Sequence, residues 1–220
     1  MLRPAKLLAI YLVVLPGIAA AQGFRFSTED KSAGQAKAER QERIESQLST
    51  PCRDRIKNRK IAVMIGEETN GAVNARQAAF SPQFDAINSR LRNVGLRTYT
   101  QEEIRRQIAQ AEMDAYFRND PEAARTAAKR LGASYTLKGL ISTRSMRNPV
   151  IAVNQVAVSM HFVLTNADGR RVAQAEAQSQ SFSGADVQGM ALTLVNEQAE
   201  EVVAKLYSEY CQKAEPAKTK

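Results

Sequence analysis

The sequence predicts an α/β fold, in which a mixed sheet of about five strands is covered by helices and followed by a long C-terminal helix. Three observations lead to this prediction. The apolar run 60–66, KIAVMIG, is typical of a strand buried on both faces. Residues 150–165 and 171–182 alternate in polarity around an Asn-Ala-Asp-Gly turn, as in a β-hairpin. Residues 185–211 carry apolar side chains at helical spacing.

The first 21 residues have the pattern of a secretory signal peptide. Arg3 and Lys6 precede an apolar run at 7–15, and three alanines end at Ala21. This predicts export to the periplasm, with cleavage before Gln22. The run is shorter than the roughly 20 residues that a membrane helix needs, so a retained anchor is the weaker alternative.

Domain boundaries follow from composition. Residues 22–51 are rich in Gln, Glu, Lys, Arg, Ser and Ala, which predicts a flexible or partly helical linker. Residues 52–212 are expected to form one α/β domain, and 213–220 a frayed tail. Removal of 1–21 deletes Arg3 and Lys6, so the formal net charge falls from +8 to +6.

The first half of the domain alternates between strands and helices. Residues 67–79 read as a polar loop, and Ser81-Pro82 predicts the start of a helix that ends at Gly95. A short strand is expected at 96–99. The capping box Thr100 to Glu103 then opens a helix that is expected to continue to Phe117.

The segment TAAKRLGASYTLKGLIS (126–142) holds Lys138 between two glycines. A phosphate-binding loop needs Gly-x4-Gly-Lys-Ser/Thr, and Lys138 precedes the second glycine instead. Gly132 is therefore expected to end a helix that begins after Asn119-Asp120-Pro121. Residues 135–142 are expected to form a strand in which Gly139 marks a bulge or a close backbone contact.

Two cysteines, Cys52 and Cys211, flank the domain. In an oxidising compartment such a pair predicts a disulfide, which would enclose nearly the whole domain. The alternative is a pair of free or metal-binding thiols.

Catalytic residues are scarce. His161 is the single histidine, and Glu67 and Glu68 follow the first strand, where α/β sheets often bind ligands. Adjacent residues of an extended segment point apart, so these carboxylates do not form an acid pair. We expect a protein that is not an enzyme and has no cofactor or metal. A small hydrolase that uses His161 with Glu67 or Glu68 is the weaker alternative.

Two features favour binding. Arg144, Arg147, Arg170 and Arg171 are expected at strand ends or turns, where they can meet an acidic partner. Glutamines at 174–180, including Gln174 and Gln178, alternate with small residues and predict a strand with one solvated face, near a sheet edge open to an added strand. Both features are also typical of ordinary solvated surface.

The order of these elements resembles a group of bacterial envelope domains. KIAVMIG, the helix that follows it, LRTYTQEEIRRQI and AARTAAKRLGASYTLKGLIS are similar to the amino-terminal domain of TolB, to LpoB-type activators of penicillin-binding proteins and to CsgG. The similarity in motif covers 60–142, and in order of elements 150–211. Ser134 departs from the usual Asp, Met64-Ile65-Gly66 replaces the usual turn after the first strand, and no cysteine follows the predicted cleavage point for lipid attachment.

The resemblance implies a non-enzymatic module that docks on an envelope assembly for cell-wall synthesis, secretion or surface appendages. The excess positive charge allows an alternative, a binder of polyanions such as glycans or lipid headgroups. Peptidoglycan and outer-membrane components are therefore further candidate partners. No aromatic stacking platform accompanies the arginines, so nucleic acid is not expected.

Overall fold

The computed structural model describes residues 27–56, 59–69, 71–74, 81–118, 120–150 and 153–214. The chain divides into two compact units, Met1–Ala36 and Lys37–Lys220. Helix α1 (Ser27–Leu48) begins in the first unit and ends in the second. The predicted signal peptide lies outside the described residues. The boundaries proposed for the linker, the domain and the tail remain predictions.

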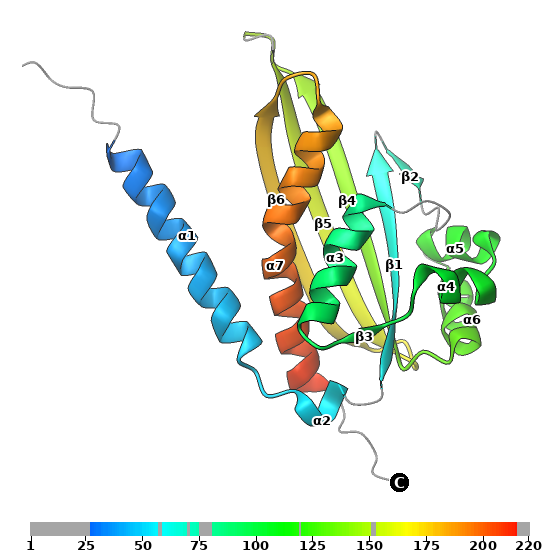
Figure 1. Ribbon diagram of the computed structural model, residues 1–220. Helices are drawn as coiled ribbons and strands as arrows, with labels where there is room; N and C mark the ends of the chain where they lie inside the picture. Colours follow the sequence, from blue (N-terminus) through cyan, green and yellow to red (C-terminus); the bar gives the residue numbers. More distant parts are fainter. Residues whose placement is uncertain are drawn as a thin grey trace, which may run out of the picture. The chain divides into compact units, whose positions relative to one another are not determined.

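A six-stranded mixed sheet forms the centre of the second unit, so the predicted α/β fold class is confirmed (Figure 1). Its order is β2-β1-β4-β5-β6, with β3 also beside β1. Strand β1 runs parallel to β3 and β4, and the other pairs are antiparallel. The strands are β1 (Lys60–Thr69), β2 (Ala72–Asn74), β3 (Arg97–Thr98), β4 (Tyr135–Arg147), β5 (Asn154–Asn166) and β6 (Arg171–Ser183).

The main hydrophobic core lies between the sheet and helices α3 (Pro82–Asn93) and α7 (Val187–Lys213), which cross in front of it in Figure 1. Alternate residues of the strands face these helices because successive side chains of a strand point to opposite faces. This core contains Ile61, Val63, Leu137, Ile141, Val156, Val158, Met160, Phe162, Leu164, Ala173, Ala175, Ile87, Leu91, Leu194, Val195, Val202, Val203 and Leu206.

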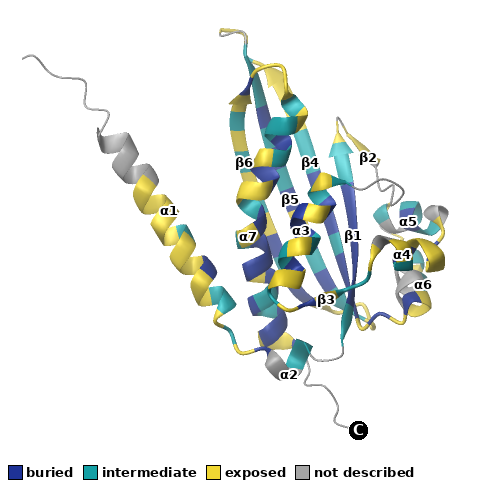
Figure 2. Cartoon of the chain, viewed as in Figure 1, coloured by how far each residue is buried: buried dark blue, intermediate teal, exposed yellow. Residues whose placement is uncertain are grey.

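A smaller core covers the other face of the sheet at β1. Short helices α4 (Gln101–Gln107), α5 (Gln110–Phe117) and α6 (Pro121–Leu131) contribute to it. Its members are Ala62, Met64, Ile104, Ile108, Met113, Leu131 and Ala133. On this face, most of the side chains of β4, β5 and β6 remain partly or fully exposed, as the teal and yellow segments in Figure 2 show.

Several predicted helix ends are found where the sequence places them. The Ser81 side chain caps α3 by accepting a hydrogen bond from the Phe84 N–H, and Thr100 and Glu103 form the expected capping box. Gly95 and Gly132 follow helices with positive φ angles of 89° and 59°, which glycine adopts without a Cβ clash.

Two predictions for the first half of the domain are wrong. In the expected loop at 67–79, residues 67–69 instead continue β1, and 72–74 form β2, which pairs with β1 through a turn at Gly71 (φ 82°). Residues 70 and 75–79 of this predicted loop lie outside the described residues. The expected single helix from Thr100 to Phe117 is interrupted at Ile108, whose backbone is extended. The Glu112 carboxylate accepts a hydrogen bond from the Ala109 N–H at 3.0 Å, which starts a second helix there.

The long strands also differ from their predicted limits. β4 continues to Arg147 rather than ending at Ser142, because each residue of its polar second half is paired with β5. β5 begins at Asn154 instead of Val150, while β6 and α7 end within two residues of their expected positions. Neighbouring strands therefore override the local composition.

Candidate functional site: the open face of the sheet

The open face is the side of β4, β5 and β6 that points away from α3 and α7. Residues directly opposite each other on the three strands form rows across it. These rows are Met146–Gln155–Phe182, Arg144–Ala157–Gln180, Ser142–Ser159–Gln178 and Leu140–His161–Glu176. The predicted solvated face of β6 therefore continues over three strands.

A shallow hollow of about 620 Å³ lies in the middle of the open face. The residues that line it are Ser142, Arg144, Ala157, Val158, Ser159, Gln178, Ser179 and Gln180. Alanine and serine reach only a short way above the sheet, whereas arginine and glutamine extend over it. The hollow thus combines space for an incoming side chain with hydroxyl, amide and guanidinium hydrogen-bonding groups.

An apolar row borders the hollow. Met146 is 68% exposed and Phe182 is 55% exposed, although both are large hydrophobic side chains. Gln155 lies between them in register and donates a hydrogen bond to Gln180 at 3.2 Å. Sequence reasoning did not single out Met146 and Phe182. The signal that identifies them is the alternation of the two strands, which places both on the polar face.

The candidate arginines do not form one cluster. Arg144 lines the hollow, whereas Arg147, the last residue of β4, belongs to the other face of the sheet. Arg170 and Arg171 lie at the turn between β5 and β6. The positions that face Arg144 and Arg171 on β5 are eight residues apart, which corresponds to roughly 27 Å along the strand.

The two candidate glutamines, Gln174 and Gln178, also lie in different parts of the open face. Gln178 lines the hollow with Arg144. Gln174 lies near the other end of β6. Its side chain accepts a hydrogen bond from Arg171 at 2.7 Å and donates one to Glu176 at 2.6 Å. Of the six predicted partner-binding residues, the structure therefore places Arg144 and Gln178 in one site.

His161, Glu67 and Glu68 each contact a different side chain. The Nδ1 atom of His161 lies 3.0 Å from a carboxylate oxygen of Glu176 on the exposed surface. Hydrogen bonding from Gln174, followed by the charge of His161, lowers the pKa of Glu176. Glu67 accepts a hydrogen bond from Ser81, and Glu68 accepts one from Ser142. Within the described ranges, no three His, Cys, Asp or Glu side chains come together as a metal site.

Lys138 and Gly139, both in β4, lie against the rings of Phe117 and Phe162. The Lys138 ammonium lies 5.6 Å from the centre of the Phe117 ring, and burial lowers the pKa of this lysine. A Cβ added at Gly139 would overlap the Phe162 ring, so the glycine permits a close contact, and β4 has no bulge there. The segment forms a strand and not a phosphate loop.

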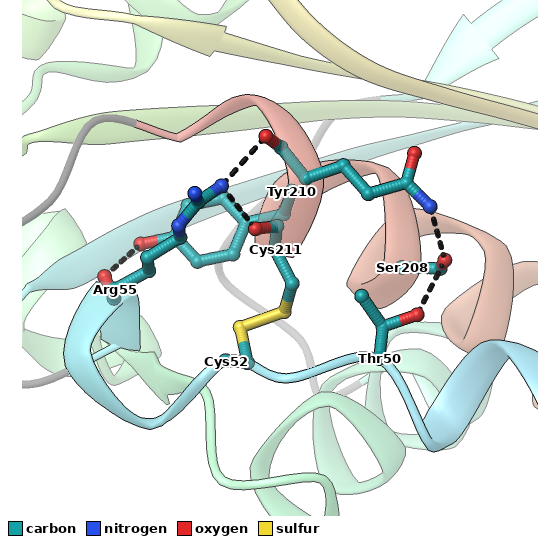
Figure 3. The surroundings of a disulfide bond; sticks show 7 residues. Thr50, Cys52, Arg55, Ser208, Tyr210 and Cys211 are labelled. Atoms are coloured by element: carbon teal, nitrogen blue, oxygen red, sulfur yellow. Dashed lines mark hydrogen bonds between the residues drawn. A yellow bond between two sulfur atoms is a disulfide. The ribbon is translucent and has the colours of Figure 1, made fainter.

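Cys52 and Cys211 are joined by a disulfide, with their Cα atoms 4.9 Å apart (Figure 3). Hydrogen bonds surround it: Tyr210 donates to the Arg55 carbonyl at 2.8 Å, and Arg55 donates to the Cys211 carbonyl. Thr50 and Ser208 share a further hydrogen bond of 2.8 Å between their hydroxyls. These contacts attach the segment before β1 to the end of α7, away from the open face.

No protein-family model matches the chain, and no curated protein matches it in sequence. Several solved structures are similar to this chain. A hypothetical protein CT253 from Chlamydia trachomatis is 12% identical, over 70% of this chain and 99% of that one, with a TM-score of 0.47. A minor lipoprotein from Acinetobacter baumannii is 11% identical, over 72% and 97%, with a TM-score of 0.42. The LpoB C-terminal domain from Salmonella enterica is 17% identical, over 64% and 95%, with a TM-score of 0.35.

LpoB, one of the proteins that the sequence resembles, is thus among the similar structures, while the resemblance to TolB and CsgG remains a prediction. A search of the described helices for a membrane span finds none of sufficient length and apolar character.

Proposed function

We propose that this protein is a non-enzymatic module of the cell envelope that docks through the open face onto another envelope protein. The observation that carries the proposal is the hollow beside Met146 and Phe182. Methionine, aromatic residues and arginine are enriched where proteins bind one another, and glutamine and serine supply hydrogen bonds around such anchors. The open face combines all of these groups on three strands that pair in register with one another.

The chemistry of the partner follows from the charges and the apolar row. Arg144 in the hollow favours a carboxylate on the partner surface, whereas Arg147 lies on the other face of β4, because successive side chains of a strand alternate. Met146 and Phe182 favour an apolar side chain beside that carboxylate. The proposed partner surface therefore combines a carboxylate with an apolar side chain.

The compartment is proposed from the sequence and the disulfide together. Residues 1–21 have the pattern of a cleaved signal peptide, and the Cys52–Cys211 bond suits an oxidising compartment. Of the predicted linker, residues 37–51 lie in the same compact unit as the sheet, so the part before Lys37 is the proposed spacer between the domain and any assembly that it joins. This arrangement supports a periplasmic protein that is processed before Gln22.

The test is co-purification from chemically cross-linked cells. The double variant Met146→Ser, Phe182→Ser removes the apolar row, and Val73→Ser on β2 is the matched control because Val73 is also exposed, at 46%. We expect one envelope protein to be recovered with the wild type and the control but not with the double variant. Equal recovery with all three proteins, or no envelope partner with the wild type, would contradict the proposal.

A polyanion is the second candidate ligand, because Arg144 lies in a hollow among hydroxyl and amide groups. Purified cell wall, sedimented with the protein at low and high salt, tests this possibility. Electrostatic binding must weaken as salt increases, and Arg144→Gln should reduce it. Retention that is insensitive to both changes would exclude this ligand class.

A further inference from the structure

The two edges of the sheet differ in how they are protected. At one edge, β2 has three residues, which offers little backbone to another strand. At the other edge, β6 has 13 residues. Natural proteins shorten, charge or interrupt edge strands, because an open edge is a template for pairing with another chain.

The direction of the free backbone groups of β6 follows from one hydrogen bond. The Gln174 N–H donates to the Glu209 carboxylate of α7 at 3.4 Å, so this N–H points away from β5. The β5–β6 register is regular from Ala173 to Ser183, and in an antiparallel pair alternate residues point the same way. The N–H groups of Glu176, Gln178, Gln180 and Phe182 therefore also point outward, and no acceptor for them is found among the described residues.

This part of the edge lacks the usual protection. Residues 176–183 contain one charged side chain, Glu176, and neither proline nor lysine. Glu176, Gln178, Gln180 and Phe182 are exposed, and the alternate positions 177, 179 and 181 carry alanine or serine, which are half-buried and too small to cover the backbone. Helix α1 contacts α7 through Arg40 and Arg43, which pair with Glu201, and within the described residues it forms no hydrogen bond with β6. The backbone edge of this segment is therefore available to a second strand.

We propose that the second strand is β6 of another copy of this chain, paired antiparallel about a two-fold axis at Ser179. In this register Gln178 pairs with Gln180 of the second copy, and Glu176 pairs with Phe182 of the second copy. All four outward N–H groups of each copy gain an acceptor, while the Gln174–Glu209 hydrogen bond is kept.

The charges favour a second copy as the occupant. A symmetric pair must not place like charges opposite each other, and here the one charged residue, Glu176, meets a phenylalanine rather than itself. Gln178 and Gln180 place two amides opposite each other, where each can donate and accept. The interface uses the backbone edge of β6, so it is distinct from the docking of an envelope protein on the open face.

Engineered cysteines test the register. Ser179 of the two copies would be opposite each other at a non-hydrogen-bonded position, with Cα atoms about 4.5 Å apart, a distance that a disulfide spans. Ser181 lies on the same face, but its two copies would be about 13 Å apart, at four residues of offset. The experiment uses the mature chain, residues 22–220, under mild oxidation and reads cross-linking on a non-reducing gel.

We expect Ser179→Cys to form a covalent dimer and Ser181→Cys to remain largely monomeric. A mixture of Ala177→Cys and Ser181→Cys should cross-link, because these positions are opposite each other in the same register. Equal cross-linking of Ser179→Cys and Ser181→Cys would overturn the register.

A proline variant tests the edge without a new thiol. Gln178→Pro removes an N–H that points outward and so loses no hydrogen bond to β5, whereas Gln178→Ala keeps that N–H. In sedimentation equilibrium, the wild type and Gln178→Ala should dimerise, and Gln178→Pro should shift to monomer with its cooperative thermal unfolding retained. A wild type that stays monomeric up to millimolar concentration would overturn the proposal, as would a Gln178→Pro variant that dimerises like the wild type. The cysteine variants decide the question if the proline variant does not fold.

Discussion

The ring of Phe162 on β5 lies directly over the backbone of Gly139 on β4, in the centre of the main core. These residues face each other in the register of the two strands, and Phe162 is fully buried. A Cβ at position 139 would overlap the ring and also lie 3.1 Å from Ile65. The Phe162 ring thus occupies the space above the glycine.

Substitution of Gly139 is expected to destabilise the fold. Gly139→Ala forces the Phe162 ring to move in a packed core, which should lower the free energy of unfolding by about 1–3 kcal/mol. Urea unfolding followed by circular dichroism measures this change. Gly184→Ala is the control, since a Cβ there meets nothing within 4 Å. In the double variant with Phe162→Leu, the cost of Gly139→Ala should be smaller; an unchanged cost would show that the ring contact is not its cause.

Loss of the Cys52–Cys211 bond should strongly reduce stability. The cysteines are 159 residues apart, and the chain-entropy description assigns a loop of this size up to about 5 kcal/mol. We expect Cys52→Ala, Cys211→Ala to unfold at a lower urea concentration than the oxidised wild type, and dithiothreitol to affect only the wild type. Intact mass after thiol alkylation of the unfolded, non-reduced protein provides the check: two alkylated cysteines would contradict the bond.

The capping box at the start of α4 makes stability dependent on pH. The Lys60 ammonium, 2.7 Å from Glu103, and then the Thr100 N–H hold the pKa of Glu103 below its ordinary value of 4.5. This contribution is therefore present above that value and is lost as the pH falls through the lower pKa of the folded state. Glu103→Gln should be less stable than the wild type at pH 7, and the difference should shrink as the pH falls below 4.5.

The second hydrogen bond of the capping box, from the Glu103 N–H to the Thr100 hydroxyl, can be tested at a single pH. Thr100→Ala removes the acceptor of the Glu103 N–H, which is 3.1 Å from the hydroxyl, and should cost about 1 kcal/mol. Thr100→Ser keeps the acceptor and should retain most of the stability. Equal losses in the two variants would mean that the hydroxyl does not cap α4.

Lys138 is expected to reduce the stability of the protein at neutral pH. Burial lowers its pKa, so the charged form is less favourable in the folded state than in the unfolded one, and stability rises as the pH increases through this lowered value. Lys138→Met should therefore raise the unfolding midpoint at pH 7. The gain over the wild type should shrink towards pH 10.5. Lys129→Met, at an exposed position of α6, should show neither effect.

The sequence predicted features that depend on neighbours along the chain. Ser81 and Thr100 cap helices because a side-chain oxygen binds an N–H three residues later, and Gly132 ends a helix through its own backbone conformation. The alternation of β5 likewise follows from the geometry of a single strand. Such signals are local, so they can be recognised without the rest of the fold.

Tertiary structure decided the extent of the strands and the membership of the candidate site. Residues 143–147 are polar, but pairing with β5 holds them in β4 and places Met146 in one row with Phe182. The same register places Arg144 and Gln178 in neighbouring rows that line one hollow, and Arg171 lies near the opposite end of β5 and β6. Sequence by itself determined the fold class, the helix caps and the two cysteines. Which side chains meet on the open face depended on strand order and register, because those contacts join residues that are distant in the chain.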